Sequence, residues 1–294
     1  MKNKLFIFAL LFITFQLNSA PKVKHVVIIG CDGFGAYAYE QANIPNIKAL
    51  AAKGSFCPAM RTVLPSSSAV NWASMLMGAG PTMHGYTEWG SKTPEIPSTT
   101  VSRYGKFPSI FTIIREQMPK SKTATIYSWG GIEYLLEKDI IDIVIPAKSN
   151  EDFCADTAAT IIRKEKPTFT FIHFDEPDHI GHQAGHNMPQ YYEMLEEVDK
   201  RVGKIIDAVN EAGIANETVI IVTADHGGIN KGHGGKSIQE VETPFVICGP
   251  GIKKNHVTTD KMIIYDVAAT IAKILKLKQP QVWRGKAMDD FFVK

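Results

Sequence analysis

Hydrophobic and polar positions form two kinds of segment along the chain. Short runs of apolar, largely β-branched residues bounded by Gly, Asp or Ser are typical of buried strands. Longer segments with apolar residues three or four positions apart are typical of amphipathic helices. The strand-like runs are residues 25–30, 57–64, 123–129, 140–145, 169–174, 218–222 and 244–248, and the helix-like segments are residues 45–53, 69–77, 107–117, 151–164, 191–209 and 266–276.

This alternation of strands and helices predicts the α/β class, with a mostly parallel central sheet flanked by helices on both faces. The helix-like segments carry end signals: Pro45 stands at the start of one and Gly54 just beyond its end. The chain contains no linker-like tract and no internal repeat. We therefore expect residues 21–294 to form one domain, with a small excursion around residues 80–105.

The first twenty residues have a different composition from the rest. Lys2 and Lys4 precede the apolar run LFIFALLFITF, and Asn18-Ser19-Ala20 follows it. This pattern predicts a signal peptide over residues 1–20, with a retained anchor helix as the alternative. No later segment approaches the roughly 18 uninterrupted apolar residues of a membrane span. We expect an exported protein, periplasmic or secreted, with no membrane span after signal removal.

Composition narrows the possible classes further. The chain has 294 residues, 45% of them hydrophobic and 21% charged, which is ordinary for a globular protein. A net charge of +2 argues against a nucleic-acid-binding surface. The four cysteines include no CxxC pair, which disfavours a thiolate zinc site. Cys31 and Cys248 lie beside strand-like runs and are expected to be buried thiols.

Candidate chemistry concentrates between Thr170 and Gly235. Six of the nine histidines of the chain lie in this stretch, and three of its aspartates lie close to them in the sequence. These residues are His173, His179, His182, His186, His226, His233, Asp175, Asp178 and Asp225. Two groups of these residues follow the strand-like runs FTFIHF and VIIVTA. Carboxylates and imidazoles gathered at strand ends are the oxygen and nitrogen ligands that a divalent metal ion requires.

Two earlier segments carry further candidates. Asp32 follows the first strand-like run, and the carboxyl ends of parallel strands are where α/β sheets bind ligands. Ser68 directly precedes the apolar helix-like segment that Gly78 closes. A serine there is ordinarily a helix cap. The same position also directs a hydroxyl to a helix N-terminus, where a phosphoryl anion is stabilised.

The candidate ligands divide into two sets of three. Asp32, Asp225 and His226 form one set, and Asp178, His182 and His233 form the other. Three protein ligands leave an open position on each ion, as catalytic zinc requires. Two ions about 4 Å apart form the two-metal arrangement that serves phosphoryl transfer. His173, His179 and His186 are expected to be bystanders, solvated or hydrogen-bonded to backbone.

Local geometry sets two conditions on these sets. Asp178 and His182 share one face if their segment is helical, whereas Gly181 is equally compatible with a loop. Asp225 and His226 are adjacent, so they face one ion only from a bent loop. The following Gly227-Gly228 pair makes such a loop possible.

Four motifs together resemble the alkaline phosphatase superfamily, and within it the nucleotide pyrophosphatase/phosphodiesterase (type I phosphodiesterase) branch. The motifs are CDGFG at 31–35, SAVNWASMLMG at 68–78, PDHIGHQAGH at 177–186 and ADHGGINKGHGG at 224–235. The resemblance extends over about residues 24–290. It implies two zinc ions per chain, one held by Asp32, Ser68, Asp225 and His226 and the other by Asp178, His182 and His233. It also implies that Ser68 attacks phosphorus and forms a phosphoserine.

The chain departs from this branch in two ways. The branch typically has Thr as nucleophile, whereas Ser68 occupies that position when the segment is aligned on Asn71, which we treat as an alignment anchor and not a catalytic group. The branch also has an Asn shortly after a His-Gly pair that donates to a phosphoryl oxygen. Here His84-Gly85 is followed by YTEW with no Asn, which leaves Thr87 or a backbone N–H as the candidate replacement.

The expected function is hydrolysis of phosphodiester or nucleotide pyrophosphate bonds in a small phosphate ester, with a nucleotide as one possible substrate. The alternative is a phosphomonoesterase or phosphonate hydrolase of the same superfamily, which the serine favours and the lack of an Arg just after Ser68 disfavours. A third interpretation is a non-catalytic metal- or ligand-binding protein. The sulfatase motif C-x-P-S-R does not occur. Trp72, Tyr86 and Trp89 are candidates to stack on a planar substrate group or to pack in the core.

Overall fold

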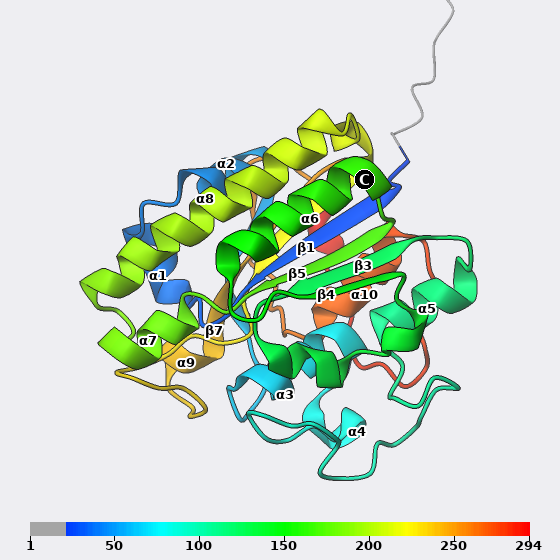
Figure 1. The fold of residues 1–294 in the computed structure, drawn as a ribbon, viewed down its shortest axis with the longest axis horizontal. Helices are drawn as coiled ribbons and strands as arrows, with labels where there is room; N and C mark the ends of the chain where they lie inside the picture. The colour runs from blue at the N-terminus through cyan, green and yellow to red at the C-terminus, as the bar shows by residue number, and fades with distance from the viewer. Residues whose placement is uncertain (1–21) are drawn as a thin grey trace, which may run out of the picture.

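The computed structural model describes residues 22–294, so the predicted signal peptide over residues 1–20 lies outside the described part (Figure 1). The strands are β1 His25–Cys31, β2 Ser55–Arg61, β3 Thr123–Tyr127, β4 Ile143–Pro146, β5 Phe169–Phe174, β6 Thr218–Thr223, β7 Glu242–Cys248 and β8 His256–Val257. The helices are α1 Ala36–Gln41, α2 Pro45–Lys53, α3 Ser68–Met77, α4 Pro81–His84, α5 Ile110–Gln117, α6 Glu151–Glu165, α7 Asp178–Ala184, α8 Pro189–Glu211, α9 Ile238–Val241 and α10 Asp266–Ile274.

The strands form one eight-stranded sheet in the order β4-β3-β5-β1-β6-β7-β2-β8. Strand β7 is antiparallel to both of its neighbours, β6 and β2, and the other pairings are parallel. The predicted mostly parallel sheet is therefore confirmed. Two parallel strands run in the same direction, so the chain must cross back along the sheet before the second strand can begin. Helices make these crossover connections.

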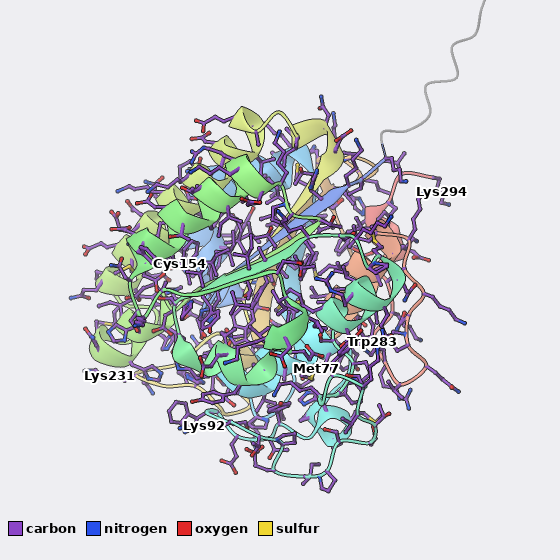
Figure 2. All side chains as sticks on the ribbon, turned by 45° about the vertical axis from the view of Figure 1, so that its right-hand side comes forward. Met77, Lys92, Cys154, Lys231, Trp283 and Lys294 are labelled. Atoms are coloured by element: carbon purple, nitrogen blue, oxygen red, sulfur yellow. The ribbon has the colours of Figure 1, made fainter. Side chains whose placement is uncertain are left out.

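Helices cover both faces of the sheet, as predicted. Val27 and Ile29 of β1 pack in one apolar cluster with α1, α2, α6 and α8, whereas Val26 and Ile28 pack in a second with α3, α5 and α10. Strand side chains alternate between the faces, so a strand covered on both sides must be apolar throughout. Figure 1 shows α6 and α8 side by side over one face. Figure 2 labels a side chain of each cluster, Cys154 of α6 and Met77 of α3.

Several predicted boundaries need correction. The strand expected over residues 57–64 begins earlier and ends at Arg61, because the following residues turn into α3. The strand expected from Ile140 begins at Ile143, since Lys138–Ile140 forms a 3-10 turn. Helix α8 is longer than predicted, with Pro189 in its first turn. Cys31, Cys57, Cys154 and Cys248 are all free thiols, and the first three are buried.

Three neighbouring strands end at the same level of the sheet. Gly30 of β1 lies opposite His173 of β5 on one side and Thr223 of β6 on the other. The segments that follow β1, β5 and β6 therefore leave the sheet together at its carboxyl edge. Within residues 22–294, no helix combines the length and the apolar character needed to cross a membrane.

Candidate active site

The first predicted ligand set converges beyond β1 and β6. Asp32 directly follows β1, and Asp225 and His226 lie in the irregular segment after β6. His226 Nε2 is 3.3 Å from Asp32 Oδ1 and 3.2 Å from Asp225 Oδ2. Ser68 Oγ, in the first turn of α3, is 3.1 Å from the same nitrogen. The bent loop expected at Gly227-Gly228 is present, and it directs two adjacent side chains toward one point.

The second predicted set surrounds Asp178. This residue begins α7, so the helical alternative for the segment is the correct one. One helical turn places His182 Nε2 3.1 Å from Asp178 Oδ2. His233 comes from the loop after β6, and its Nε2 lies 3.7 Å from the same carboxylate oxygen. Asp178, His182 and His233 thus offer ligand atoms close enough together to hold one ion.

The two sets are adjacent and form one cluster. Asp178 also lies within metal-sharing distance of Asp32 and His226, and the rings of His226 and His233 stack with centroids 3.7 Å apart. Gly33 allows this approach: its φ is +72°, and a Cβ on it would lie 2.6 Å from the Cβ of Asp178. A larger residue at this position would force α7 away from the end of β1.

Three buried carboxylate oxygens in the cluster have no hydrogen-bond partner among the described residues. They are Oδ1 of Asp32, Oδ1 of Asp178 and Oδ2 of Asp225. Leaving a buried charged oxygen unpaired is costly, and native proteins rarely do so. The oxygens share their space with imidazole nitrogens, and the combined donor set of carboxylates, imidazoles and a hydroxyl suits a divalent cation. The residues present therefore fit the metal ions that the sequence predicts.

The electrostatics of the carboxylates reflect this crowding. Burial raises the pKa of Asp225 well above its usual range, and the nearby Asp32 and Asp178 carboxylates add to the effect. Burial also opposes ionisation of Asp32, but the hydrogen bond from His173 and the charge of His226 outweigh it and lower its pKa. A cation at the centre of the cluster would relieve the repulsion between these carboxylates.

The two histidines of the second set differ in protonation. The hydrogen bond to Asp178 raises the pKa of His182 to about 9. Burial, with the nearby His226, lowers the pKa of His233 to about 4. Imidazole binds metal only in its neutral form. His233 is therefore ready to bind an ion near neutral pH, whereas His182 must first release a proton.

Two histidines that we expected to be bystanders contact the cluster, so that expectation is wrong for them. His173 Nε2 is 3.0 Å from Asp32 Oδ2, and both residues are buried. His186, also buried, places Nε2 3.4 Å from Asp178 Oδ1. The uninterrupted apolar run around His173 was the available signal, because a histidine in a strand buried on both faces needs a polar partner. His179 is exposed, and its ring Nε2 lies 2.7 Å from Nε2 of Gln183 rather than in contact with either ligand set.

Asn71 has a structural role in the segment that precedes α3. Its Nδ2 donates to the carbonyls of Val63, Pro65 and Ser67 at 3.1–3.2 Å. Its Oδ1 accepts a hydrogen bond of 2.8 Å from the Val63 amide. These contacts hold the turn that presents Ser68, which agrees with treating Asn71 as an alignment anchor and not as a catalytic group.

The groups considered as replacements for the phosphoryl-binding Asn already donate hydrogen bonds to other protein oxygens. The Thr87 amide and hydroxyl both donate to Oε2 of Glu95, at 2.7 and 3.2 Å. The Ala69 amide, at the start of α3, donates to the Trp89 carbonyl at 3.1 Å. Thr87 is therefore a hydrogen-bond donor within its own loop and not toward the cluster.

Two cavities open at the cluster. The smaller one, of about 190 Å³, is lined by Ser68, Trp89, Trp129, Asp175, Asp178, His179, His182 and His233. The larger one, of about 590 Å³, is lined by Pro65, Ser67, Thr87, Glu88, Trp89, His182, His233 and Gly234. Of the three aromatic residues proposed to stack on substrate, Trp72 and Tyr86 are buried in the core. Trp89 is 66% exposed and forms a wall of both cavities.

The chain is similar in sequence to proteins of known activity. The family model described as "Type I phosphodiesterase / nucleotide pyrophosphatase" matches residues 26–231. A venom phosphodiesterase of Macrovipera lebetinus is 24% identical over 230 residues, covering 72% of this chain and 26% of that protein. Ectonucleotide pyrophosphatase/phosphodiesterase family member 1 of Mus musculus is 23% identical over 275 residues, covering 86% of this chain and 30% of that protein. The chain thus spans less than a third of the length of these relatives.

Solved structures show the same fold. Murine ectonucleotide pyrophosphatase/phosphodiesterase 5, in an inactive form in complex with AMP, has a TM-score of 0.74 at 16% identity, and the match covers 92% of this chain and 100% of that one. A 2-O GAG sulfatase has a TM-score of 0.70 at 14% identity, covering 92% of this chain and 73% of that one. The α/β architecture is therefore common to proteins with different chemistries, and function must be argued from the site.

Proposed function

Since the chain belongs to the type I phosphodiesterase / nucleotide pyrophosphatase family, we propose that it hydrolyses phosphodiester or nucleotide pyrophosphate bonds, with two zinc ions and Ser68 as nucleophile. The observation that carries the proposal is the convergence of the Ser68 hydroxyl with two sets of carboxylates and imidazoles at one edge of the sheet. The proposed substrate is a small phosphate ester, with nucleotides included.

The proposed zinc ligands are the residues of the cluster. Asp32, Ser68, Asp225 and His226 would hold one ion, and Asp178, His182 and His233 would hold the other. The unpartnered carboxylate oxygens of Asp32, Asp178 and Asp225 support this assignment. When bound, zinc neutralises charge that develops on the phosphoryl oxygens and lowers the pKa of the serine hydroxyl.

The reaction would proceed in two displacements. Ser68 Oγ forms a bond to phosphorus as the bond from phosphorus to the leaving oxygen breaks in line with it, and the hydroxyl proton is lost to solvent. Water then cleaves the phosphoserine, which restores the Ser68 hydroxyl and releases the phosphorylated product. Ser68 is buried and its turn is tied down by Asn71, so the attacking oxygen is oriented before substrate binds.

Export is part of the same proposal. The basic and apolar composition of residues 1–20 supports a signal peptide, which would deliver residues 21–294 as the catalytic unit to the periplasm or the exterior. An exported phosphodiesterase would meet substrates outside the cytoplasm.

The test combines metal analysis with substrate choice. Mature protein is analysed for zinc and assayed with bis(p-nitrophenyl) phosphate and p-nitrophenyl phosphate. About two zinc ions per chain with faster diester hydrolysis is the expected result. The same zinc content with faster monoester hydrolysis would replace the diesterase by a phosphomonoesterase. No metal uptake and no turnover after zinc is supplied would indicate a binding protein.

A further inference from the structure

His186 occupies a space that two glycines keep open. The residue lies two positions beyond the end of α7 and is 4% exposed. A Cβ on Gly181, within α7, would lie 2.6 Å from the nearest atom of the imidazole. A Cβ on Gly228, in the loop after β6, would lie 2.3 Å from it. Non-bonded atoms do not pack so closely, so both positions must lack a side chain while the ring is present.

The imidazole of His186 faces the carboxylate of Asp178. His186 Nε2 lies 3.4 Å from Asp178 Oδ1. Both atoms are buried, and neither has a hydrogen-bond partner within residues 22–294. Leaving such groups unpaired is costly, and in the tautomer with its proton on Nε2 the ring donates to Oδ1. Nδ1 of the ring has no partner among the same residues either, so no competing hydrogen bond turns the ring away.

The position of the ring is fixed from two further sides. It packs against the ring of Tyr191 in α8, with centroids 5.4 Å apart. The Tyr191 hydroxyl in turn donates to the carbonyl of Gly33, just beyond β1, at 2.7 Å. The backbone amide of His186 donates to the Asn230 carbonyl at 2.6 Å. Helix α8, the end of β1 and the loop after β6 therefore meet at this imidazole.

The turn that accepts this amide also carries the other two members of the second ligand set. Asn230 lies in a tight turn that two backbone hydrogen bonds close. Lys231, labelled in Figure 2, follows it, and the Lys231 carbonyl is 2.9 Å from His182 Nδ1. His233 comes two residues later. The contacts around the buried imidazole thus reach all three proposed ligands of the second ion.

A carboxylate that binds a metal ion is held in orientation by hydrogen bonds to its other oxygen. Asp178 directs Oδ2 toward His182 and His233, and its Oδ1 faces His186. We propose that His186 is a positioning residue for the second metal site, which donates to Oδ1 and so holds Oδ2 toward the ion. This inference rests on the proposed two-zinc site, and it implies that the affinity for one ion can be changed without changing the affinity for the other.

The test compares two substitutions of similar length that differ in one donor group. His186→Gln retains an N–H donor beyond the Cβ, whereas His186→Met has none. Zinc is added back to zinc-free protein in competition with a chromogenic chelator, which gives a dissociation constant for each ion. In His186→Met, binding of one ion should weaken by about 10- to 100-fold, and the other constant should stay within about twofold. In His186→Gln, both constants should stay within about threefold of wild type.

His256→Met is the matched control. It removes an imidazole whose Nε2 also lies beside a carboxylate, 2.7 Å from Asp290 Oδ2, but on β8 at the edge of the sheet. Both zinc constants should be unchanged in this variant. Thermal unfolding of the zinc-free proteins shows whether each variant is folded. If His186→Met does not fold, a tenfold loss of affinity in folded His186→Gln would still contradict the proposal.

The outcomes separate this inference from the proposed function. Wild-type affinity for both ions in His186→Met would overturn the positioning role, and so would equal losses in His186→Met and His186→Gln. Fewer than about two zinc ions in the wild type would overturn the two-zinc site, and the inference with it. Two zinc ions without hydrolysis of bis(p-nitrophenyl) phosphate would overturn the phosphodiesterase alone, because the zinc constants are measured without substrate.

Discussion

His173 Nε2 lies 3.0 Å from Asp32 Oδ2 at the buried junction of β5 and β1. The indole N–H of Trp72 donates to the same oxygen, also at 3.0 Å. Two donors on Oδ2 leave Oδ1 as the oxygen that faces His226. His173 and Trp72 therefore orient the Asp32 carboxylate, in the way that outer hydrogen bonds orient metal ligands in other proteins.

His173→Phe should weaken zinc binding by about 10- to 100-fold, because the carboxylate loses a donor that holds its orientation. The affinity is measured by competition with a chromogenic chelator. His25→Gln is the control, since it removes an imidazole from the other end of β1, where His25 contacts the Pro167 carbonyl. Wild-type zinc affinity in His173→Phe would show that His173 only packs against Trp72.

Ser68→Ala should lower kcat by at least about a thousandfold while zinc remains bound, because it removes the attacking oxygen and only one of seven proposed ligand groups. The measurements are steady-state rates and metal content. Ser66→Ala is the control: the Ser66 hydroxyl donates to the Gly235 carbonyl at 2.7 Å and is not directed at the ligand sets. Near-normal activity in Ser68→Ala, or loss of activity in Ser66→Ala alone, would remove Ser68 as nucleophile.

Asp178→Ala should lower zinc content and activity together, because this carboxylate borders both groups of potential ligands. Elemental analysis of the purified variant measures the zinc. Asp175→Ala provides the comparison, since Asp175 lines the smaller cavity but belongs to neither ligand group. Unchanged zinc stoichiometry in Asp178→Ala would contradict its assignment as a ligand.

The sequence predicted the parts of the fold that depend on local pattern. The apolar run around Val26–Ile29 indicated a strand buried on both faces, and the spacing of apolar residues indicated α8. The antiparallel direction of β7 is a different kind of property. It depends on pairing with the distant strands β2 and β6. The apolar pattern of residues 244–248 predicts a strand but does not indicate its direction relative to those neighbours.

The same distinction holds at the candidate site. Asp32, Asp178 and Asp225 were recognisable from their joint arrangement after strand-like runs, because α/β sheets bind ligands at the carboxyl ends of their strands. His173 and His186 were missed because their partners are distant carboxylates, and a single sequence does not show which histidine reaches which carboxylate. Thr87 was one of the candidate phosphoryl donors because the sequence does not show that its amide and hydroxyl both donate to Glu95, eight residues later.

Glu137 offers a prediction about pH and stability away from the site. This buried carboxylate accepts hydrogen bonds from Ser109 Oγ at 2.7 Å and Thr112 Oγ1 at 2.6 Å. Burial raises its pKa, and the two hydroxyls offset the shift only in part. The folded state therefore binds this proton more tightly than the unfolded state does. As pH falls from about 7 to about 4, wild type should gain free energy of unfolding relative to Glu137→Gln.

Glu240→Gln should show the opposite trend and serves as the matched comparison. Burial raises the pKa of Glu240, but hydrogen bonds from Ser237 and the Gly235 amide outweigh it and leave the pKa lowered. Its contribution to stability is present above the unfolded-state pKa and is lost as pH falls toward the lowered folded value. Urea unfolding at several pH values measures both differences. Burial disfavours the charged form of Glu137, whereas hydrogen-bond donors favour the charged form of Glu240. If the difference in unfolding free energy between wild type and variant changed with pH in the same direction for both, these opposed pKa shifts would be contradicted.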